Sequence, residues 1–332
     1  MAQGKSSRRS GARDQNAGPV QESLQKTSQT LVRHAVDVGE TCGAAAIFIH
    51  ADALEALALP RNLNPKVIFI VKTEGQQQQM QDEGADCLRV PNVHLTRMGQ
   101  VKIAVFLAQA RGMIKPGQTI VCLTGMAASG TLDTLVVVQV GREFEMYRTE
   151  NEAEQIPSHI RPEVVERVVD IATELGNEGR EGKPVGALFV VGDAERVIEL
   201  SRQLILNPFR GYSPKERNLL DPALEETVKE LAGLDGAFVV QGDGVIETCG
   251  SFLKTVTQDE SALPHGLGAR HHAAAAITIL TDSIAVTVSE STGTVTIFRS
   301  GKIVTDIEKP RSVAQQREFG GSGSTHSPRK EA

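Results

Sequence analysis

Short apolar runs alternate with helix-like stretches along the first half of the chain. Five runs rich in Val and Ile have the length and character of buried strands, at residues 44–50, 66–72, 87–90, 119–123 and 134–140. Three stretches between them have helical patterns, at residues 51–58, 76–84 and 96–112. Because strands that alternate with helices are typical of a parallel α/β sheet, we predict such a sheet for this half.

The second half of the chain combines helices with strands and a hairpin. An amphipathic helix begins near residue 164 and is expected to stop at Gly176. A buried strand at 186–192 is followed by a helix over 194–205, which Asp193 is expected to cap. Further elements are expected as a helix near 214–233, a hairpin that turns at 242–244, a helix from Arg270, strands at 283–289 and 294–299, and a final edge strand. The pattern predicts a mixed α/β sheet flanked by helices.

Composition along the chain predicts its domain organisation. Residues 1–28 and 309–332 are rich in Ser, Arg, Gln and Gly, so we expect a disordered arm and a disordered tail. The polar segment 149–159 is predicted to be a linker. These boundaries leave two α/β domains, at residues 29–148 and 160–308.

Charge and hydropathy narrow the class of protein. No apolar run reaches the roughly 18 residues of a membrane-spanning helix, and the N-terminus lacks the apolar core of a secretory signal. We therefore expect a soluble, cytoplasmic protein with no membrane contact. The net charge is −6, and the basic ends leave the body of the chain at −11, a poor match for a phosphate backbone. With no Trp and only two Tyr to stack on bases, nucleic acid is not an expected partner.

Some segments only partly match known nucleotide or metal motifs. Residues 125–130 have the spacing of a phosphate loop, but Thr131 stands where that loop needs lysine. Two later segments that begin at Gly242 and Gly266 lack the third glycine of a dinucleotide fingerprint. The four cysteines have neither zinc nor redox spacing, so we expect buried, reduced thiols.

Three other segments combine groups that suit a nucleotide and its metal. Asp235 stands at the mouth of an apolar strand, where a carboxylate can bind a divalent ion, although Asp before Gly236 is also a common turn former. The loop from Gly266 runs into a helix start with Arg270, which suits a phosphate unless that arginine merely faces solvent. The turn at 289–293 offers hydroxyls and a carboxylate, as many hairpin turns do.

The order of these segments resembles the catalytic domain of the diadenylate cyclases, the family that includes the DNA-integrity-scanning cyclase. The resemblance covers about residues 180–306 and is strongest in DGA at 235–237, GLGARHHAA at 266–274 and TDSIAVTVSESTG at 281–293. It implies a nucleotidyltransferase that condenses two ATP molecules into cyclic di-AMP, releases two pyrophosphates and uses Mg²⁺ or Mn²⁺. The alternatives are a catalytically impaired sensor of ATP or cyclic di-AMP, and a metal phosphohydrolase.

The resemblance also implies roles for individual residues. Asp235 would bind the metal, with Glu290 nearby, and would help to activate the ribose 3′-hydroxyl. Arg270, His271 and His272 would grip the polyphosphate of ATP, and Arg270 and His271 would act with Asp235 in catalysis. The residues that the resemblance places at the ATP site are Gly236, Ala237, Leu253, Gly268, Ala269, Arg270, His271, His272 and Ser289.

Three positions depart from the usual pattern of the family. Ala269 stands where threonine is common, His272 where a second arginine is common, and Ser291 where a second acid is common. Histidine is mostly neutral at pH 7, so affinity for polyphosphate is expected to fall or to vary with pH. Asp235 and Arg270 are both present, so we expect activity to survive.

The first domain resembles the C-terminal regulatory domain of pyruvate kinase. The similar segments lie at residues 44–57, 66–90 and 111–137, and the last contains KPGQTIV and the glycine loop. The resemblance implies a module for ligand sensing or assembly.

The symmetry of the implied product predicts self-association. Each 3′-hydroxyl must attack the α-phosphate of the other ATP, which one site with one ATP cannot arrange. We therefore expect a homo-oligomer in which two cyclase domains face each other about a two-fold axis.

Overall fold

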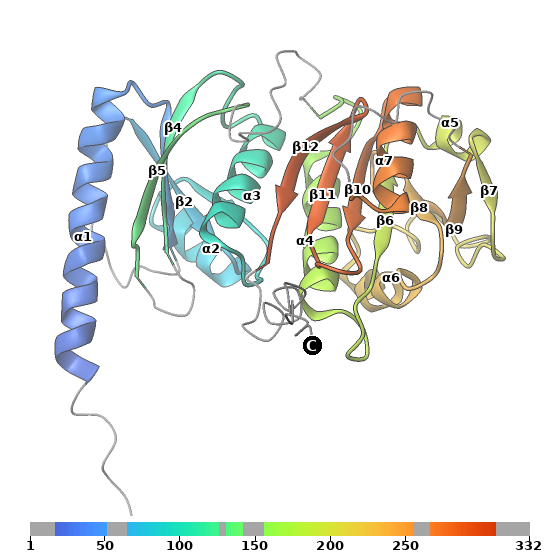
Figure 1. Cartoon of the computed structure of the whole chain (residues 1–332), viewed down its shortest axis with the longest axis horizontal. Helices are drawn as coiled ribbons and strands as arrows, with labels where there is room; N and C mark the ends of the chain where they lie inside the picture. Colours follow the sequence, from blue (N-terminus) through green and yellow to red (C-terminus); the bar gives the residue numbers. More distant parts are fainter. Residues whose placement is uncertain (1–16, 52–64, 126–130, 142–155, 255–265, 310–332) are drawn as a thin grey trace, which may run out of the picture. The chain divides into compact units, whose positions relative to one another are not determined.

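The computed structural model describes residues 17–51, 65–125, 131–141, 156–254 and 266–309 (Figure 1). Its contacts divide the chain into two compact units, residues 1–89 with 112–145 and residues 90–111 with 146–332. Among the described residues, no helix is both long and apolar enough to cross a membrane.

The first unit is built on a five-stranded sheet in the order β3-β2-β1-β4-β5. The strands are β1 (Ala46–His50), β2 (Lys66–Val71), β3 (Cys87–Arg89), β4 (Thr119–Thr124) and β5 (Thr134–Gln139). The five expected strands are confirmed, but β5 runs antiparallel to β4. The connection between β4 and β5 is shorter than the dozen or so residues that a parallel crossover needs, so the chain can only turn back.

Helix α1 (Ala17–Thr41) begins inside the segment that we expected to be disordered, so that expectation is wrong for residues 17–28. The helix packs on the sheet through Val32 and Ala35. Ser28 is buried, and its Oγ accepts a hydrogen bond from the Leu132 amide at 3.0 Å. Tertiary contacts therefore order a stretch whose composition alone does not.

Helix α2 (Glu74–Asp82) confirms the helix expected at 76–84. Its N-terminus is closed by a capping box between Thr73 and Gln76. The helix expected at 51–58 lies almost entirely outside the described residues, as do the central residues of the glycine segment at 125–130.

The second unit is built on a mixed seven-stranded sheet in the order β12-β11-β10-β6-β8-β9-β7. The strands are β6 (Ala187–Val191), β7 (Ser201–Gln203), β8 (Ala237–Val240), β9 (Ile246–Leu253), β10 (Ile284–Val288), β11 (Val295–Arg299) and β12 (Lys302–Ile307). Only β6 and β8 pair in parallel within this sheet. The mixed α/β sheet predicted for this half is confirmed.

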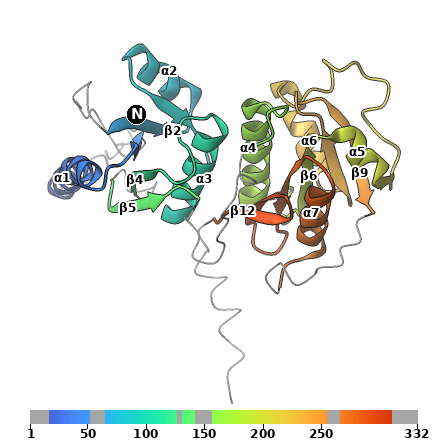
Figure 2. The same cartoon turned by 90° about the horizontal axis from the view of Figure 1, so that it is seen from above.

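Helices cover both faces of this sheet. They are α3 (Arg97–Ala110), α4 (Pro162–Glu178), α5 (Ala194–Glu199), α6 (Glu225–Leu231) and α7 (Ala269–Leu280), with a 3₁₀ turn η3 at Pro222–Leu224. Helix α7 packs its alanines against Leu188 and Val190 of β6. Because side chains alternate along a strand, Phe189 and Val191 point to the other face, where α4 lies (Figure 2).

Two expected helices differ from the structure in length. The helix expected over 194–205 ends at Glu199, because the backbone then pairs with β9 as the edge strand β7. The helix expected near 214–233 is reduced to α6 and η3, since Asp221 caps a new start at Pro222.

Two residues expected to delimit helices have other roles. Gly176 does not stop α4, which continues to Glu178 and ends at Gly179 with φ of +67°. A Cβ at Gly176 would lie 2.2 Å from the Gly293 carbonyl oxygen, so glycine permits a close backbone approach. Asp193 precedes α5 but does not cap it, because its Oδ2 accepts a hydrogen bond from the Asp282 amide at 3.0 Å.

Candidate functional site

Three segments that are distant in the sequence meet at one edge of the second sheet. Arg270 Nη2 lies 3.6 Å from Asp235 Oδ1, and Arg270 Nη1 lies 3.4 Å from Glu290 Oε2. Asp235 immediately precedes Gly236 and β8, Arg270 lies in the first turn of α7, and Glu290 lies in the turn after β10. The structure therefore brings together Asp235, predicted at the start of a strand, and Arg270, predicted at the start of a helix.

Sheet topology explains why these segments meet. β8 runs parallel to β6, so both strands start at the same edge of the sheet. β10 runs antiparallel to β6, so β10 ends at this edge. A short connection joins α7 to β10, so the N-terminus of α7 returns to the edge at which β10 ends.

Gly186, which sequence reasoning did not select, lies at the centre of this arrangement. A Cβ at Gly186 would lie 2.5 Å from Arg270 Nη1 and 3.1 Å from Glu290 Cβ. The glycine immediately precedes β6, the strand between the strands that carry the two carboxylates. The sequence signal was a glycine immediately before a buried strand. The strand order is needed to recognise that this glycine lies between the two carboxylates.

The charged groups of the site face solvent to different degrees. The Arg270 side chain is 30% exposed, whereas the Asp235 side chain is 92% exposed and that of Glu290 is 65% exposed. Two open carboxylates beside one guanidinium can bind a cation and a phosphate at the same time.

The two carboxylates fit a metal that is shared with a substrate. Among the described residues, no three His, Cys, Asp or Glu side chains gather into a metal cage. Mg²⁺ is usually held by one or two carboxylates together with substrate phosphates, and Mn²⁺ takes similar oxygen ligands. Asp235 and Glu290 therefore suit such an ion when a polyphosphate supplies the other ligands.

The start of α7 leaves room for a ligand. Gly268 occupies the N-cap position in extended conformation, and its carbonyl accepts a hydrogen bond from the His271 amide at 2.9 Å. A Cβ at Gly268 would contact none of the described residues, and Ala269 is also exposed. The first amides of a helix have no partner within it and attract anions.

His271 does not join Arg270 at this edge. The residue is 7% exposed, its Nε2 lies 3.5 Å from Thr296 Oγ1, and its ring meets Phe298 edge-on. Burial lowers the pKa of His271, and the charges of His272 and Arg270 lower it further. His271 therefore packs as a neutral core side chain between α7 and β11. His272 is partly buried on the same helix.

Three residues predicted to line the ATP site have clear structural roles. Gly236 has φ of +101°, and a Cβ there would lie 2.7 Å from the Gly250 carbonyl carbon, so the approach of β9 alone accounts for this glycine. Ala237 and Leu253 are buried in the core cluster beneath α7.

Phe252 is an exposed residue of β9 that sequence reasoning did not consider. Its side chain is 47% exposed on β9, and the Arg202 guanidinium carbon lies 5.0 Å from the ring centroid. Successive residues of a strand face opposite sides, and Leu253 belongs to the core cluster beneath α7, so Phe252 faces the side of the sheet away from α7.

Ser289 takes part in the turn that presents Glu290. Its Oγ lies 3.2 Å from Ser291 Oγ and accepts a hydrogen bond from the Thr292 amide at 3.3 Å. The Gly293 amide closes the turn on the Ser289 carbonyl at 2.8 Å. The hydroxyl therefore lies on the same short turn as one of the two carboxylates.

Comparison with known families separates the chain into two matched regions. Residues 174–303 match the family described as "DisA bacterial checkpoint controller nucleotide-binding". Residues 27–146 match a different family, described as "Probable sensor domain DacZ_P". All the residues predicted for the site lie in the first of these regions.

Two archaeal relatives are named "Diadenylate cyclase". The protein of Methanocaldococcus jannaschii is 38% identical over 60% of this chain and 63% of its own length. The protein of Haloferax volcanii is 36% identical over 63% of this chain and 75% of its own length. A crystal structure of DacA from Staphylococcus aureus has 23% identity, covers 47% of this chain and 92% of that one, and superposes with a TM-score of 0.29.

Proposed function

Because this chain belongs to the diadenylate cyclase family, we propose that it condenses two ATP molecules into cyclic di-AMP and releases two pyrophosphates. The observation that supports this proposal is the placement of Arg270 within 3.6 Å of Asp235 and 3.4 Å of Glu290. A nucleotide polyphosphate needs both a cation for its oxygens and carboxylates for its metal, and this edge of the sheet carries both.

Each half-reaction joins one ribose oxygen to one phosphorus. The 3′-oxygen of one ATP bonds to the α-phosphorus of the other, the bond to the bridging oxygen breaks, and pyrophosphate leaves. We propose that Asp235 accepts a hydrogen bond from the 3′-hydroxyl and receives or relays its proton. Arg270 would bind phosphate oxygens and stabilise their developing charge. Ser289 would donate a hydrogen bond to a phosphate.

Asp235 and Glu290 would hold a divalent ion, Mg²⁺ or Mn²⁺, whose chemistry is to neutralise phosphate charge. The amides at the start of α7, beside Gly268, would donate hydrogen bonds to the remaining phosphate oxygens.

We propose that the protein acts as a homo-oligomer with facing cyclase domains. The product is two-fold symmetric, and one chain supplies one Asp235–Arg270–Glu290 set. Two sets related by a two-fold axis would present each 3′-hydroxyl to the opposite α-phosphate. Since ATP is abundant in the cytoplasm, we also propose a cytoplasmic location.

We propose that the first unit forms a sensing module fused to a cyclase domain. The predicted bounds of these domains are residues 29–148 and 160–308, whereas the contacts assign residues 90–111, with helix α3, to the second unit. The match of residues 27–146 to a probable sensor domain supports a sensing role. The resemblance to the pyruvate kinase C-terminal domain suggests ligand sensing or assembly, and it stays a prediction.

An impaired sensor is the less favoured alternative. His272 and Ser291 depart from the family pattern, but Asp235 and Arg270 are present and close together. The decisive experiment incubates purified protein with ATP and Mn²⁺ or Mg²⁺ and identifies the products by mass. Cyclic di-AMP supports the proposal, whereas ATP binding without product indicates a sensor, and AMP or ADP indicates a phosphohydrolase.

A further inference from the structure

Helix α6 leads directly to Asp235 and has little apolar packing. Among its residues only Val228 and Lys229 are buried. A tight turn joins the end of α6 to Asp235, with the Gly233 amide 3.3 Å from the Glu230 carbonyl oxygen and the Leu234 amide 3.1 Å from the Leu231 carbonyl oxygen. A displacement of α6 would therefore move Asp235.

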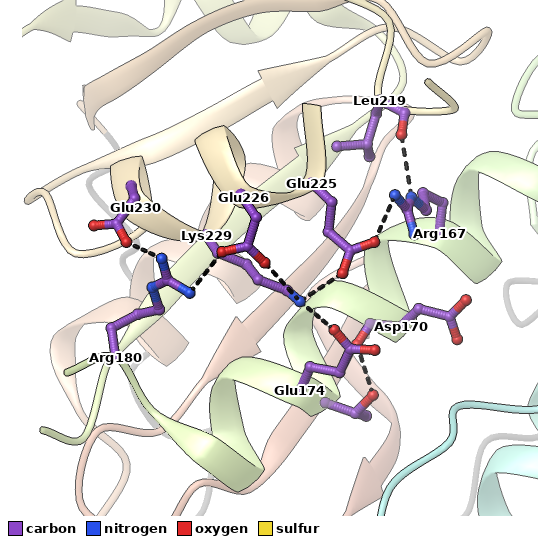
Figure 3. Close-up of polar contacts among 10 residues, drawn as sticks. Arg167, Asp170, Glu174, Arg180, Leu219, Glu225, Glu226, Lys229 and Glu230 are labelled. Carbon is purple, nitrogen blue, oxygen red and sulfur yellow. Dashed lines mark hydrogen bonds and ion pairs between the residues drawn. The ribbon is translucent and has the colours of Figure 1, made fainter. Parts of the chain in front are cut away.

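Ion pairs attach this helix to α4 (Figure 3). Lys229 is 8% exposed, and its Nζ lies 2.6 Å from Glu225 Oε1 within α6 and contacts Glu174 Oε2 of α4. Glu226 is farther from the same Nζ, at 3.7 Å. Arg167 of α4 adds a second link, since its Nη2 lies 2.9 Å from Glu225 Oε2.

The protonation states of these groups support a charged link. Burial works against the charge on Lys229, but hydrogen bonds to Glu174 and Glu225 outweigh it and raise the pKa of Lys229. The hydrogen bond from Lys229 lowers the pKa of Glu225 against the effect of burial. Lys229 and Glu225 are therefore both ionised at neutral pH.

The same end of α4 also touches the turn that carries Glu290. Gly176, two residues after Glu174 and so on the other side of α4, is in close backbone contact with Gly293, because a Cβ there would lie 2.2 Å from the Gly293 carbonyl oxygen. Lys309 Nζ donates to the Gly176 carbonyl at 2.8 Å. One short stretch of α4 thus contacts both the helix before Asp235 and the turn with Glu290.

We propose that the Glu174–Lys229 ion pair is a positioning device that fixes Asp235 relative to Glu290 and Arg270. The inference rests on the proposed function and names residues that act through Asp235 rather than on the substrate. Buried charges are costly, and an apolar pair can dock a helix equally firmly. An ion pair with a directed hydrogen bond also fixes the relative orientation of the two helices. Positioning a carboxylate in a site requires such a fixed orientation, whereas docking a helix on its neighbour does not.

The test compares two single-carboxylate variants, Glu174→Ala and Glu226→Ala. In Glu174→Ala, Lys229 keeps its 2.6 Å pair with Glu225, so no buried charge is left alone while the direct link from Lys229 to α4 is lost. Glu226→Ala removes a carboxylate from the same cluster but leaves the Glu174 link in place. Arg180, which lies 3.0 Å from Glu226, keeps its contact with Glu230 in that control.

Amide hydrogen exchange and steady-state kinetics with ATP supply the measurements. A small displacement of a reacting group costs up to about 100-fold in rate. We therefore expect Glu174→Ala to lower kcat by about tenfold or more, with a smaller change in KM, and to increase exchange over residues 232–236. Glu226→Ala should match the wild type in both measurements, and both variants should remain folded by circular dichroism.

The outcomes separate this inference from the proposed function. Equal kcat and equal exchange in the two variants would overturn the positioning role. If the wild type makes no cyclic di-AMP, the proposed function fails, and exchange over residues 232–236 still decides the inference. A selective increase in Glu174→Ala then supports positioning of Asp235, and its absence overturns it.

Discussion

Replacing Arg270 with alanine distinguishes a nucleotide-binding arginine from a structural one. In the structure Arg270 pairs with Asp235 at 3.6 Å and with Glu290 at 3.4 Å, and both partners are largely exposed. Ion pairs with such exposed partners contribute about 0–1 kcal/mol to the free energy of unfolding. One kcal/mol shifts the melting temperature of a domain of this size class by about 2–4 °C. The two pairs together therefore contribute at most about 2 kcal/mol, and we expect Arg270→Ala to melt no more than about 8 °C below the wild type.

The loss of ATP affinity should be much larger. A hydrogen bond between charged groups contributes about 1.5–3 kcal/mol, and each 1.4 kcal/mol corresponds to about a tenfold change in Kd. If Arg270 binds the polyphosphate, Arg270→Ala should weaken ATP binding by about 10- to 100-fold. Because this is a loss of binding affinity, a measurement of ATP binding alone should detect it, without any measurement of turnover.

Isothermal titration with ATP and thermal melting of the same samples test both expectations. Arg196→Ala is a matched control, because Arg196 is an exposed arginine paired with Glu199 on α5. The control should leave ATP affinity unchanged. A sharp fall in the melting temperature of Arg270→Ala together with unchanged ATP affinity would refute the binding role and make Arg270 structural.

Three further variants test other parts of the structure. Asp235→Asn should abolish cyclic di-AMP formation, measured by mass, without unfolding the protein, because the side chain is 92% exposed; retained activity would remove the metal assignment. Burial lowers the pKa of His271 in the folded state, so as pH falls below about 6.5 the unfolded chain takes up a proton first and stability falls. His271→Leu should weaken this dependence in urea unfolding at pH 7.5 and 5.5, and an unchanged dependence would contradict the assignment. Gly176→Ala should lower stability in urea by about 1–3 kcal/mol through its clash with Gly293, and wild-type stability would contradict that contact.

Local pattern was sufficient for most strands. The Val- and Ile-rich runs that became β1 and β4 are almost entirely buried, and the run that became β2 is buried at every position except Lys66, Val67 and Phe69, so their limits lie within two residues of the limits of the apolar sequence. Glycine signals succeeded where the backbone itself turns, as at Gly112, which follows α3 with φ of +66°. They failed at Gly176, where glycine is needed because the backbone closely approaches Gly293, a residue distant in the sequence.

Candidate site residues divide in the same way. Asp235 and Arg270 could be predicted because their residue types stand beside recognisable turns and helix starts. The burial of His271 could not be predicted, because two adjacent histidines on a helix look alike until the position of the sheet selects one face. Lys229 was also missed, since its partner Glu174 lies on another helix and nothing in the local sequence marks it as buried.

The convergence of the site depends on strand order more than on any single motif. β6 lies between β8 and β10, so the start of β6 is placed between Asp235 and Glu290. Arg270 occupies the space that a side chain at Gly186 would fill, and it thereby reaches both carboxylates. The three motifs would be ordinary turns on any sheet that paired these strands differently. The enzymatic reading therefore requires the non-local pairing of β6 with β8 and β10, which sequence spacing does not encode.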